Sequence, residues 1–301
     1  MKKIISPLIL TTAAMIWGFA FAAQKAAENG PAFTLGAARG FLATVFLVFV
    51  IITFDKINGN KRRLFSKEKK LDFNKYELIG GAICGAILAA ASYFQQTGIN
   101  NGTSPGKASF ITALYVVLVP IYALVLKKRA GLNVWFSVLF AAVGFYLLCI
   151  NESLTIVTSD AFVIIAALIF PIHILTIDKF SPICDGVRMS CVQFFTCGVL
   201  SAILALITES PINFTAVSEA ILPVLFLGIG SSGIAYTLQI IGQNGVNPSA
   251  ASLILSMESV FGVIGSAIFV GDSMTPREYI GSIIVFAAVI LSQIEFKKKA
   301  K

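Results

Sequence analysis

Glu258 is the residue whose type and surroundings are best suited to chemistry, because it is a lone carboxylate in the middle of an apolar stretch. If that stretch crosses a membrane, a charge at its centre costs about 2.5–3.5 kcal/mol on insertion scales, and such residues usually serve a function. Ala251, Gly262 and Gly265 fall on or beside its helical face and leave room for a neighbouring helix or a substrate. We interpret Glu258 as a carboxylate that exchanges a coupling proton or binds a cation. A neutral glutamic acid bonded between helices for packing is the alternative.

Two tyrosine–glutamine pairs occur with the same spacing. Tyr93 and Gln96, like Tyr236 and Gln239, are three residues apart, so each pair shares one face of a helix. Aromatic rings and amides on two such faces are suited to line a cavity for a small organic ligand. Hydrogen bonding between helices without a ligand is the alternative interpretation.

Three further side chains lie in apolar stretches. Trp17 forms an i, i+4 stripe with Phe21, a pattern typical of both packing and ligand contact. His173 is the sole histidine and is a candidate to relay protons with Glu258, while a bond to a neighbouring backbone is the simpler alternative. We expect Arg39 to be structural, near a helix end, or to attract an anionic group.

The composition indicates that these residues lie in a membrane. The 301 residues are 57% hydrophobic and only 13% charged, with a mean hydropathy of +0.86, whereas soluble domains have about 25% charged residues. Apolar stretches of about 20 residues are long enough to cross about 30 Å of hydrocarbon, and in lipid they must be helices. We therefore predict an all-α integral membrane fold of ten transmembrane helices. They run approximately over residues 4–24, 32–54, 77–97, 105–126, 134–150, 159–177, 187–207, 221–241, 248–270 and 279–294.

The positions of the basic residues predict the orientation. Threading ten helices from a cytoplasmic N-terminus puts most of the 23 lysines and arginines on the inner side, including those of the basic stretch 56–75. This distribution follows the positive-inside rule and predicts cytoplasmic N- and C-termini in the cell membrane. The basic stretch is suited to lie near anionic lipid headgroups, so the net charge of +8 does not indicate a nucleic-acid partner.

The chain contains an internal repeat. When the third and fourth spans are shifted by 143 positions, eight of 25 residues are identical, and several of these are polar, such as Gln96 with Gln239. The same shift pairs Tyr115 with Glu258. Because five is an odd number, a second five-helix copy enters the membrane from the opposite side, as in many transporters. We predict two inverted repeats, over residues 1–152 and 153–301.

The N-terminus imitates a cleavable signal peptide, since Lys2 and Lys3 precede an apolar run that ends in Ala20-Phe21-Ala22, with small residues at the first and third of these positions. Removal of this segment would leave nine spans and would spoil the pairing of the two halves. We therefore expect it to be retained as the first span.

Several motifs carry a family resemblance: Trp17-Gly18, Arg39, the segments 107–120 and 253–261, Gly271-Asp272 and Gly281. On these residues the chain resembles the EamA-type branch of the drug/metabolite transporter superfamily over essentially its whole length. The resemblance implies a ten-helix carrier of two inverted repeats, with the first helix and Trp17 beside the cavity. Members mostly export amino acids, related metabolites or toxic compounds, and a few import solutes such as choline. This chain departs from the family at Glu258-Ser259 and Gly271-Asp272, where members usually have Glu-Pro and Gly-Glu.

These observations predict a secondary transporter of a small amphipathic metabolite, with export of an amino acid or related compound coupled to protons. The expected partners are the substrate, protons and membrane lipids. Import of a cationic nutrient such as a quaternary amine, caged by aromatic rings, is one alternative. A structural subunit without transport is another. The predicted substrate-binding residues are Trp17, Tyr93, Gln96, Tyr115, Tyr236, Gln239 and Glu258, and Glu258 and His173 are the proton-coupling candidates.

The sequence does not favour an enzyme. It has no Gly-x-x-x-x-Gly-Lys-Ser/Thr phosphate loop, no His-Glu-x-x-His zinc motif and no Gly-x-Ser-x-Gly nucleophile motif. Its five cysteines show no ligand spacing, and we interpret them as small apolar side chains. We therefore predict neither a metal nor another cofactor.

Cysteine labelling tests the predicted orientation. In a background without the five native cysteines, cysteines placed at Gly59 and Ala130 should react with an impermeant thiol reagent only from the cytoplasmic side. Cysteines at Asn151 and Ser210 should react only from outside. The reverse labelling would overturn both the orientation and the inverted arrangement.

Overall fold

The structure is a computed structural model that describes residues 2–57, 72–127, 131–149, 157–210, 214–269 and 275–293, and the regular elements of this part are all helices. Most of the basic stretch 56–75, together with Gly271 and Asp272, lies outside the described residues. The elements are α1 (Lys2–Ala26), α2 (Ala32–Ile57), α3 (Lys75–Asn100), α4 (Pro105–Ala113), α5 (Tyr115–Val125), α6 (Leu132–Cys149), α7 (Thr158–Phe180), the 3₁₀ turn η1 (Ser181–Ile183), α8 (Gly186–Thr208), α9 (Phe214–Glu219), α10 (Ile221–Leu225), the π-helical η2 (Phe226–Ala235), α11 (Tyr236–Gln243), α12 (Pro248–Leu255), α13 (Glu258–Phe269) and α14 (Pro276–Gln293).

Eight helical segments of the described chain are long and apolar enough to cross a membrane. They are Ile5–Ala26, Ala32–Ile57, Lys75–Asn100, Pro105–Val125, Thr158–Ile183, Gly186–Thr208, Ile221–Gln243 and Pro248–Gly265. The structure therefore agrees with a multi-pass membrane protein but does not confirm ten spans. The fifth and tenth predicted spans correspond to α6, whose apolar part is only Leu132–Leu147, and to α14, which begins with the charged Arg277 and Glu278.

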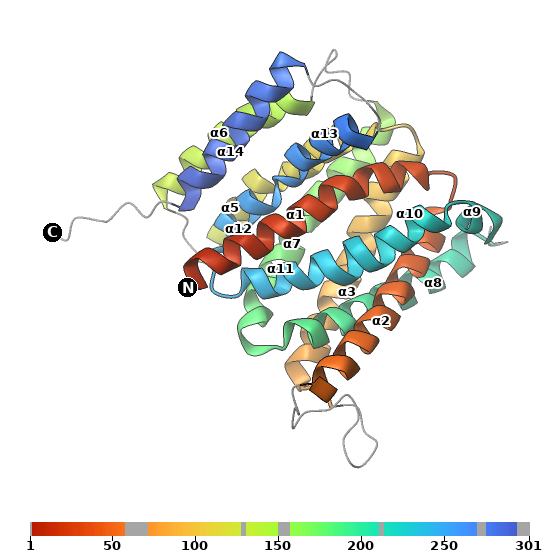
Figure 1. Cartoon of the computed structure of the whole chain (residues 1–301). Helices are drawn as coiled ribbons and strands as arrows, with labels where there is room; N and C mark the ends of the chain where they lie inside the picture. Colours follow the sequence, from red (N-terminus) through yellow and green to blue (C-terminus); the bar gives the residue numbers. More distant parts are fainter. Residues whose placement is uncertain are drawn as a thin grey trace.

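The helices form one bundle in which α1 lies between two groups of helices, with α12 and α13 on one side and η2 and α11 on the other (Figure 1). Helix α2 packs along α8, and α3 packs along both α7 and α8. Helices α6 and α14 lie side by side at one edge of the bundle (Figure 1). Large apolar side chains such as Val45, Phe49 and Leu206 are exposed on the outside, as expected of a surface that faces lipid.

The pattern of helix contacts occurs twice. Helix α3 packs against α7, and the segment η2–α11 packs against α1. The segment α4–α5 also packs against α7, and α12–α13 packs against α1. In the predicted repeat, α1 corresponds to α7, α3 to η2–α11, and α4–α5 to α12–α13. These contacts are therefore those that two related five-helix units would make, although the repeat itself stays a prediction.

Two of the spans are interrupted at equivalent positions. Helix α4 ends at Ala113 and α5 begins at Tyr115, while α12 ends at Leu255 and α13 begins at Glu258. Near the second interruption, Ser256 Oγ donates to the carbonyl of Leu253 over 2.7 Å, and such side-chain bonds to the preceding turn bend helices. Tyr115 and Glu258, which the shift of 143 positions pairs, each begin the second half of an interrupted span.

Helices α2 and α8 make a close crossing near their middle. A Cβ atom on Gly40 would lie 2.6 Å from the Cα atom of Gly198, so only glycine permits this approach. At one end of the pair, Glu209 accepts hydrogen bonds of 2.8 Å from the backbone amides of Phe33 and Thr34 and thereby caps α2. A carboxylate at a helix N-terminus also favours the helix dipole.

A buried ion pair holds the other end of α2 and α8. Arg188 Nη2 donates to both carboxylate oxygens of Asp55 over 2.9 Å, and Nη1 donates to the carbonyl of Asp72 over 3.3 Å. The two charged residues are only 3% and 8% exposed. Asp185 caps α8 beside them by accepting from the amide of Arg188. The pair thus joins the end of α2, the start of α8 and the segment that leads into α3.

Removal of one partner from this ion pair should destabilise the bundle. We expect Arg188→Leu to lower stability by about 3–5 kcal/mol, because it leaves Asp55 charged, buried and unpaired. The double variant Arg188→Leu/Asp55→Leu should recover much of this loss. Thermal unfolding in detergent measures both effects, with Lys25→Ala as a control because Lys25 and its partner Glu28 are partly exposed. Equal unfolding temperatures for Arg188→Leu and Lys25→Ala would contradict the role of the pair.

Candidate functional site

A cavity lies between the two interrupted spans and the helices around them. Its empty volume is about 550 Å³, which includes space that is open to the outside. It receives side chains from α1, α2, α3, α4–α5, α7, η2–α11 and α12–α13. Its lining consists of Trp17, Ala20, Phe21, Gln24, Arg39, Ser92, Gln95, Thr112, Tyr115, Phe170, His173, Ile174, Ser231, Tyr236, Gln239, Leu255 and Glu258. Six of the predicted site residues are among them: Trp17, Tyr115, His173, Tyr236, Gln239 and Glu258.

Glu258 is 5% exposed and lies next to Tyr115 in this cavity. The two side chains interact with each other, but neither Glu258 Oε1 nor Tyr115 Oη makes a hydrogen bond of regular geometry to any described residue. The backbone of α1 approaches this point closely, since a Cβ atom on Gly18 would lie 2.8 Å from the carbonyl oxygen of Glu258 and 2.7 Å from the amide nitrogen of Gly262. The close approach thus depends on Gly18 of α1. Among the small residues that the sequence places beside Glu258, Gly265 leaves room for Phe19, since a Cβ atom on it would lie 2.5 Å from that ring.

An aromatic cluster surrounds Tyr236 on another wall of the cavity. Its ring centroid is 4.5 Å from that of Trp17, 5.5 Å from Phe194 and 5.6 Å from His173. Trp17 Nε1 donates to the carbonyl of Ser231 over 3.3 Å, which fixes the indole against η2. Trp17 thus occupies the position beside the cavity that the family resemblance implies.

His173 lines the cavity, but its hydrogen bond runs to a different residue from Glu258. His173 Nε2 lies 3.1 Å from Gln193 Oε1, and both side chains are buried. The partner is a side chain of α8 and not the neighbouring backbone that the simpler alternative expected. A proton relay between His173 and Glu258 stays a prediction.

Tyr93 and Gln96 do not line the cavity, and this corrects the expectation of two symmetric tyrosine–glutamine faces. The Tyr93 ring stacks on Phe33 with a centroid distance of 3.9 Å. Gln96 Nε2 donates to the carbonyl of Gln24 and to Asn100 Oδ1. The physical reason is the π-helical geometry of η2. A π turn holds one more residue than an α turn, so the side chains that follow η2 are rotated relative to their counterparts on α3.

The residues of α3 that do reach the cavity were missed by the sequence reasoning. Gln95 Oε1 accepts from Gln24 Nε2 over 3.1 Å, and Gln95 Nε2 donates to Thr112 Oγ1 over 3.0 Å. Ser92 lies on the same face. Gln24, Gln95 and Thr112 thus form a hydrogen-bonded chain across α1, α3 and α4, with Gln95 at its centre. The only signal in the sequence was the polarity of Gln95 itself, which does not tell it apart from Gln96.

Arg39, which was expected to be structural or to attract an anionic group, also lines the cavity. Arg39 Nε donates to Ser232 Oγ over 3.2 Å, and the residue is half-buried. The cavity therefore contains one guanidinium and one carboxyl group. Tyr236 lies within electrostatic range of both Arg39 and Glu258. Within the described residues, no group of three histidine, cysteine or acidic side chains could hold a metal ion.

Comparison with known proteins agrees with this architecture. The model of the EamA-like transporter family matches residues 4–150 and again residues 157–293. An "Uncharacterized transporter" of Archaeoglobus fulgidus is 29% identical over 292 residues, which are 96% of this chain and 86% of that protein. The "Uncharacterized inner membrane transporter YicL" of Salmonella typhimurium is 21% identical over 272 residues, 87% of each chain. A solved crystal structure with 16% identity has the same fold, with a TM-score of 0.73 and 95% of each chain covered. The chain belongs to the EamA-like transporter family.

Proposed function

We propose that this protein is a proton-coupled secondary transporter that exports a small amphipathic metabolite, an amino acid or a related compound. The observation that carries the proposal is the cavity between the two interrupted spans, which brings Glu258, Arg39 and an aromatic wall together. Concave sites with apolar walls and a few polar groups are typical of small-molecule binding.

The charges of the cavity suit a zwitterion. The guanidinium of Arg39 is a donor-only group that pairs well with a carboxylate. The carboxyl group of Glu258 suits an ammonium group. Trp17 and Phe21 on α1, with Phe170 on α7, offer apolar surface for a side chain between these two ends. An amino acid has this combination of groups.

Alternating access would follow from two inverted five-helix units. Two separate matches to one family model, the repeated pattern of helix contacts and the equivalent interruptions support such a duplication. In transporters of this design the substrate site lies near the midplane, where the repeats meet and helices are discontinuous. The proposed topology has ten transmembrane spans with both termini in the cytoplasm. The name of the Salmonella relative favours a location in the inner membrane.

Glu258 is the proposed coupling group. A carboxyl group in a membrane cavity can accept a proton from one side and release it to the other when the carrier reorients. His173 lines the same cavity and is the second candidate for a proton carrier.

Import of a cationic nutrient is the second candidate, favoured by the aromatic cluster of Trp17 and Tyr236 beside Glu258. Arg39 argues against it, because a guanidinium in the same cavity repels a cation that has no carboxylate. Thermal stabilisation of the purified protein by amino acids and by quaternary amines separates the two candidates. A non-transporting structural subunit would be stabilised by neither.

The variant Glu258→Gln tests the coupling role, because it preserves size and one carbonyl acceptor but removes titration. We expect binding of a zwitterionic substrate to persist while pH-driven accumulation in proteoliposomes collapses. Exchange of labelled for unlabelled substrate should survive, since a loaded carrier can still reorient. Glu28→Gln is the control, because Glu28 pairs with Lys25 outside the cavity.

Other outcomes of this experiment identify other roles for Glu258. Complete loss of binding would mean that the carboxylate pairs with a cationic substrate. Wild-type binding together with wild-type accumulation would reduce Glu258 to a packing group, and Glu258→Ala would then mainly lower stability.

A further inference from the structure

Three buried oxygen atoms in the cavity have no hydrogen-bond partner among the described residues: Tyr115 Oη, Gln239 Oε1 and Glu258 Oε1. Their residues are 4%, 1% and 5% exposed, and all three line the cavity. They come from three different elements, α5, α11 and α13. The protein therefore brings three oxygens without a hydrogen bond into one cavity.

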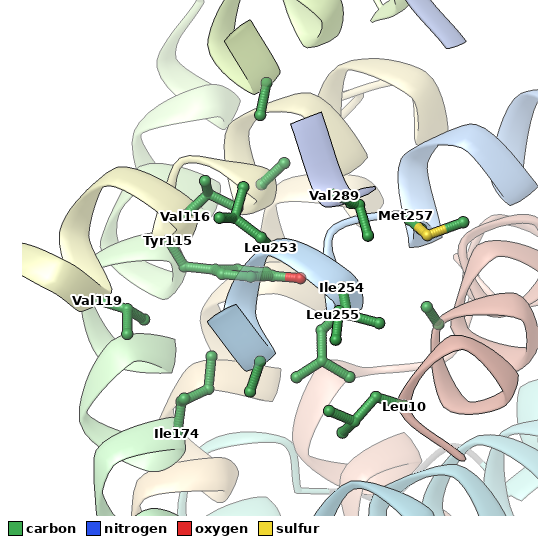
Figure 2. Packing of buried hydrophobic residues seen from close by; sticks show 14 of the residues in the cluster. Leu10, Tyr115, Val116, Val119, Ile174, Leu253, Ile254, Leu255, Met257 and Val289 are labelled. Carbon is green, nitrogen blue, oxygen red and sulfur yellow. The ribbon is translucent and has the colours of Figure 1, made fainter. Parts of the chain in front are cut away.

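The hydroxyl of Tyr115 lies beside the carboxyl group of Glu258, and its other neighbours are apolar. Figure 2 shows its ring lying flat among Val116, Leu253 and Ile254, whose side chains cannot form hydrogen bonds. A buried polar group without a partner costs about 1–3 kcal/mol, and native proteins keep few of them. Five other buried atoms without a partner, on Ser181, Gln193, Gln243, Ser249 and Arg277, lie outside the cavity lining. The three oxygens differ from them because they face space that a bound molecule can fill.

The missing partners are donors. Gln239 Oε1 can only accept, and Glu258 Oε1 can only accept when the glutamate is ionised. The Tyr115 hydroxyl can point its proton at Glu258 and still accept through its lone pairs. A primary ammonium group carries three N–H donors and no acceptor, so its hydrogen-bonding capacity matches three acceptor oxygens. A quaternary ammonium group has no donor and would leave all three oxygens unsatisfied.

We propose that Tyr115, Gln239 and Glu258 form a subsite for a substrate ammonium group that carries N–H donors, and that they discriminate against quaternary amines. The inference rests on the proposed transport function and goes beyond it, because it states which form of nitrogen the cavity accepts. Charge favours the same assignment, since the ammonium would lie beside the only carboxyl group of the cavity lining. Arg39, which can only donate, is left for the opposite end of the substrate.

The test compares amines with their N-methylated counterparts. L-Leucine, L-phenylalanine and L-threonine are each paired with the N,N,N-trimethyl betaine, and dissociation constants for the purified protein are measured by calorimetry. We expect at least one amino acid to bind at least tenfold more tightly than its betaine. Tyr115→Phe removes only a hydroxyl group and should weaken binding of that amino acid about tenfold, the usual effect of losing a hydrogen bond to a charged group. Binding of the betaine should not change.

Two further variants make the test independent of folding defects at Tyr115. Gln239→Leu removes a different acceptor and should reproduce the selective loss. Tyr122→Phe is the matched control, because the Tyr122 hydroxyl bonds to the carbonyl of Leu168 and lies outside the cavity lining. It should leave the affinity for both members of each pair unchanged.

Four results would overturn the subsite. The first two are betaines that bind as tightly as their amino acids, and a Tyr115→Phe variant that weakens the binding of an amino acid and of its betaine equally. The third is that no amino acid binds. The fourth is thermal stabilisation by sodium chloride that disappears in Tyr115→Phe. The last would assign the oxygens to a metal cation, which also prefers oxygen ligands. Uptake into proteoliposomes is measured separately. Selective binding without flux would keep the subsite and overturn the transport proposal.

Discussion

The hydrocarbon of a membrane offers no hydrogen-bond partners, and this constraint governs the whole structure. Every polar group inside the bundle must find its partner within the protein or stay unsatisfied at a cost. Most of them succeed: Arg188 pairs with Asp55, Glu209 caps α2, and Gln95 bridges Gln24 and Thr112. Eight buried polar atoms of the described residues have no hydrogen-bond partner, and three of them, on Tyr115, Gln239 and Glu258, lie in one cavity. This gathering of oxygens is the basis of the proposed subsite.

The distribution of strong and weak contacts suits a carrier. Helices α2 and α8 are fixed at both ends by charged or capping interactions and in the middle by the Gly40–Gly198 crossing. The spans that hold Tyr115 and Glu258 are instead interrupted at their centres. A short hydrogen bond of 2.8 Å between Ser109 and Ser259 links these two spans. If α2 and α8 stay fixed while the two interrupted spans bend at their interruptions, the cavity can open to one side of the membrane or the other without unfolding of the bundle.

The mixed character of the cavity decides among substrates better than its shape does. A carboxyl group, a guanidinium group and an aromatic wall converge there, and each favours a different chemical group. A simple cation suits the carboxyl group and the aromatic wall but is repelled by the guanidinium group, and a simple anion suits only the guanidinium group. A small zwitterion satisfies all three, which is why the charges of the cavity support an amino acid over a simple cation.

Composition and local pattern determined the class of this protein, because hydrocarbon imposes apolar stretches of a fixed length and penalises charge. The same penalty singled out Glu258 and Arg39. The helical spacing of small residues predicted that a neighbouring helix or a substrate approaches Glu258, and the structure shows that α1 comes close to it. Only the tertiary structure decided which polar faces meet. The π-helical turn of η2 rotates Tyr236 and Gln239 into the cavity, while Tyr93 and Gln96 on the regular helix α3 point elsewhere. Whether a buried oxygen has a partner depends on neighbours from distant helices, so no local sequence pattern could reveal the three unsatisfied oxygens.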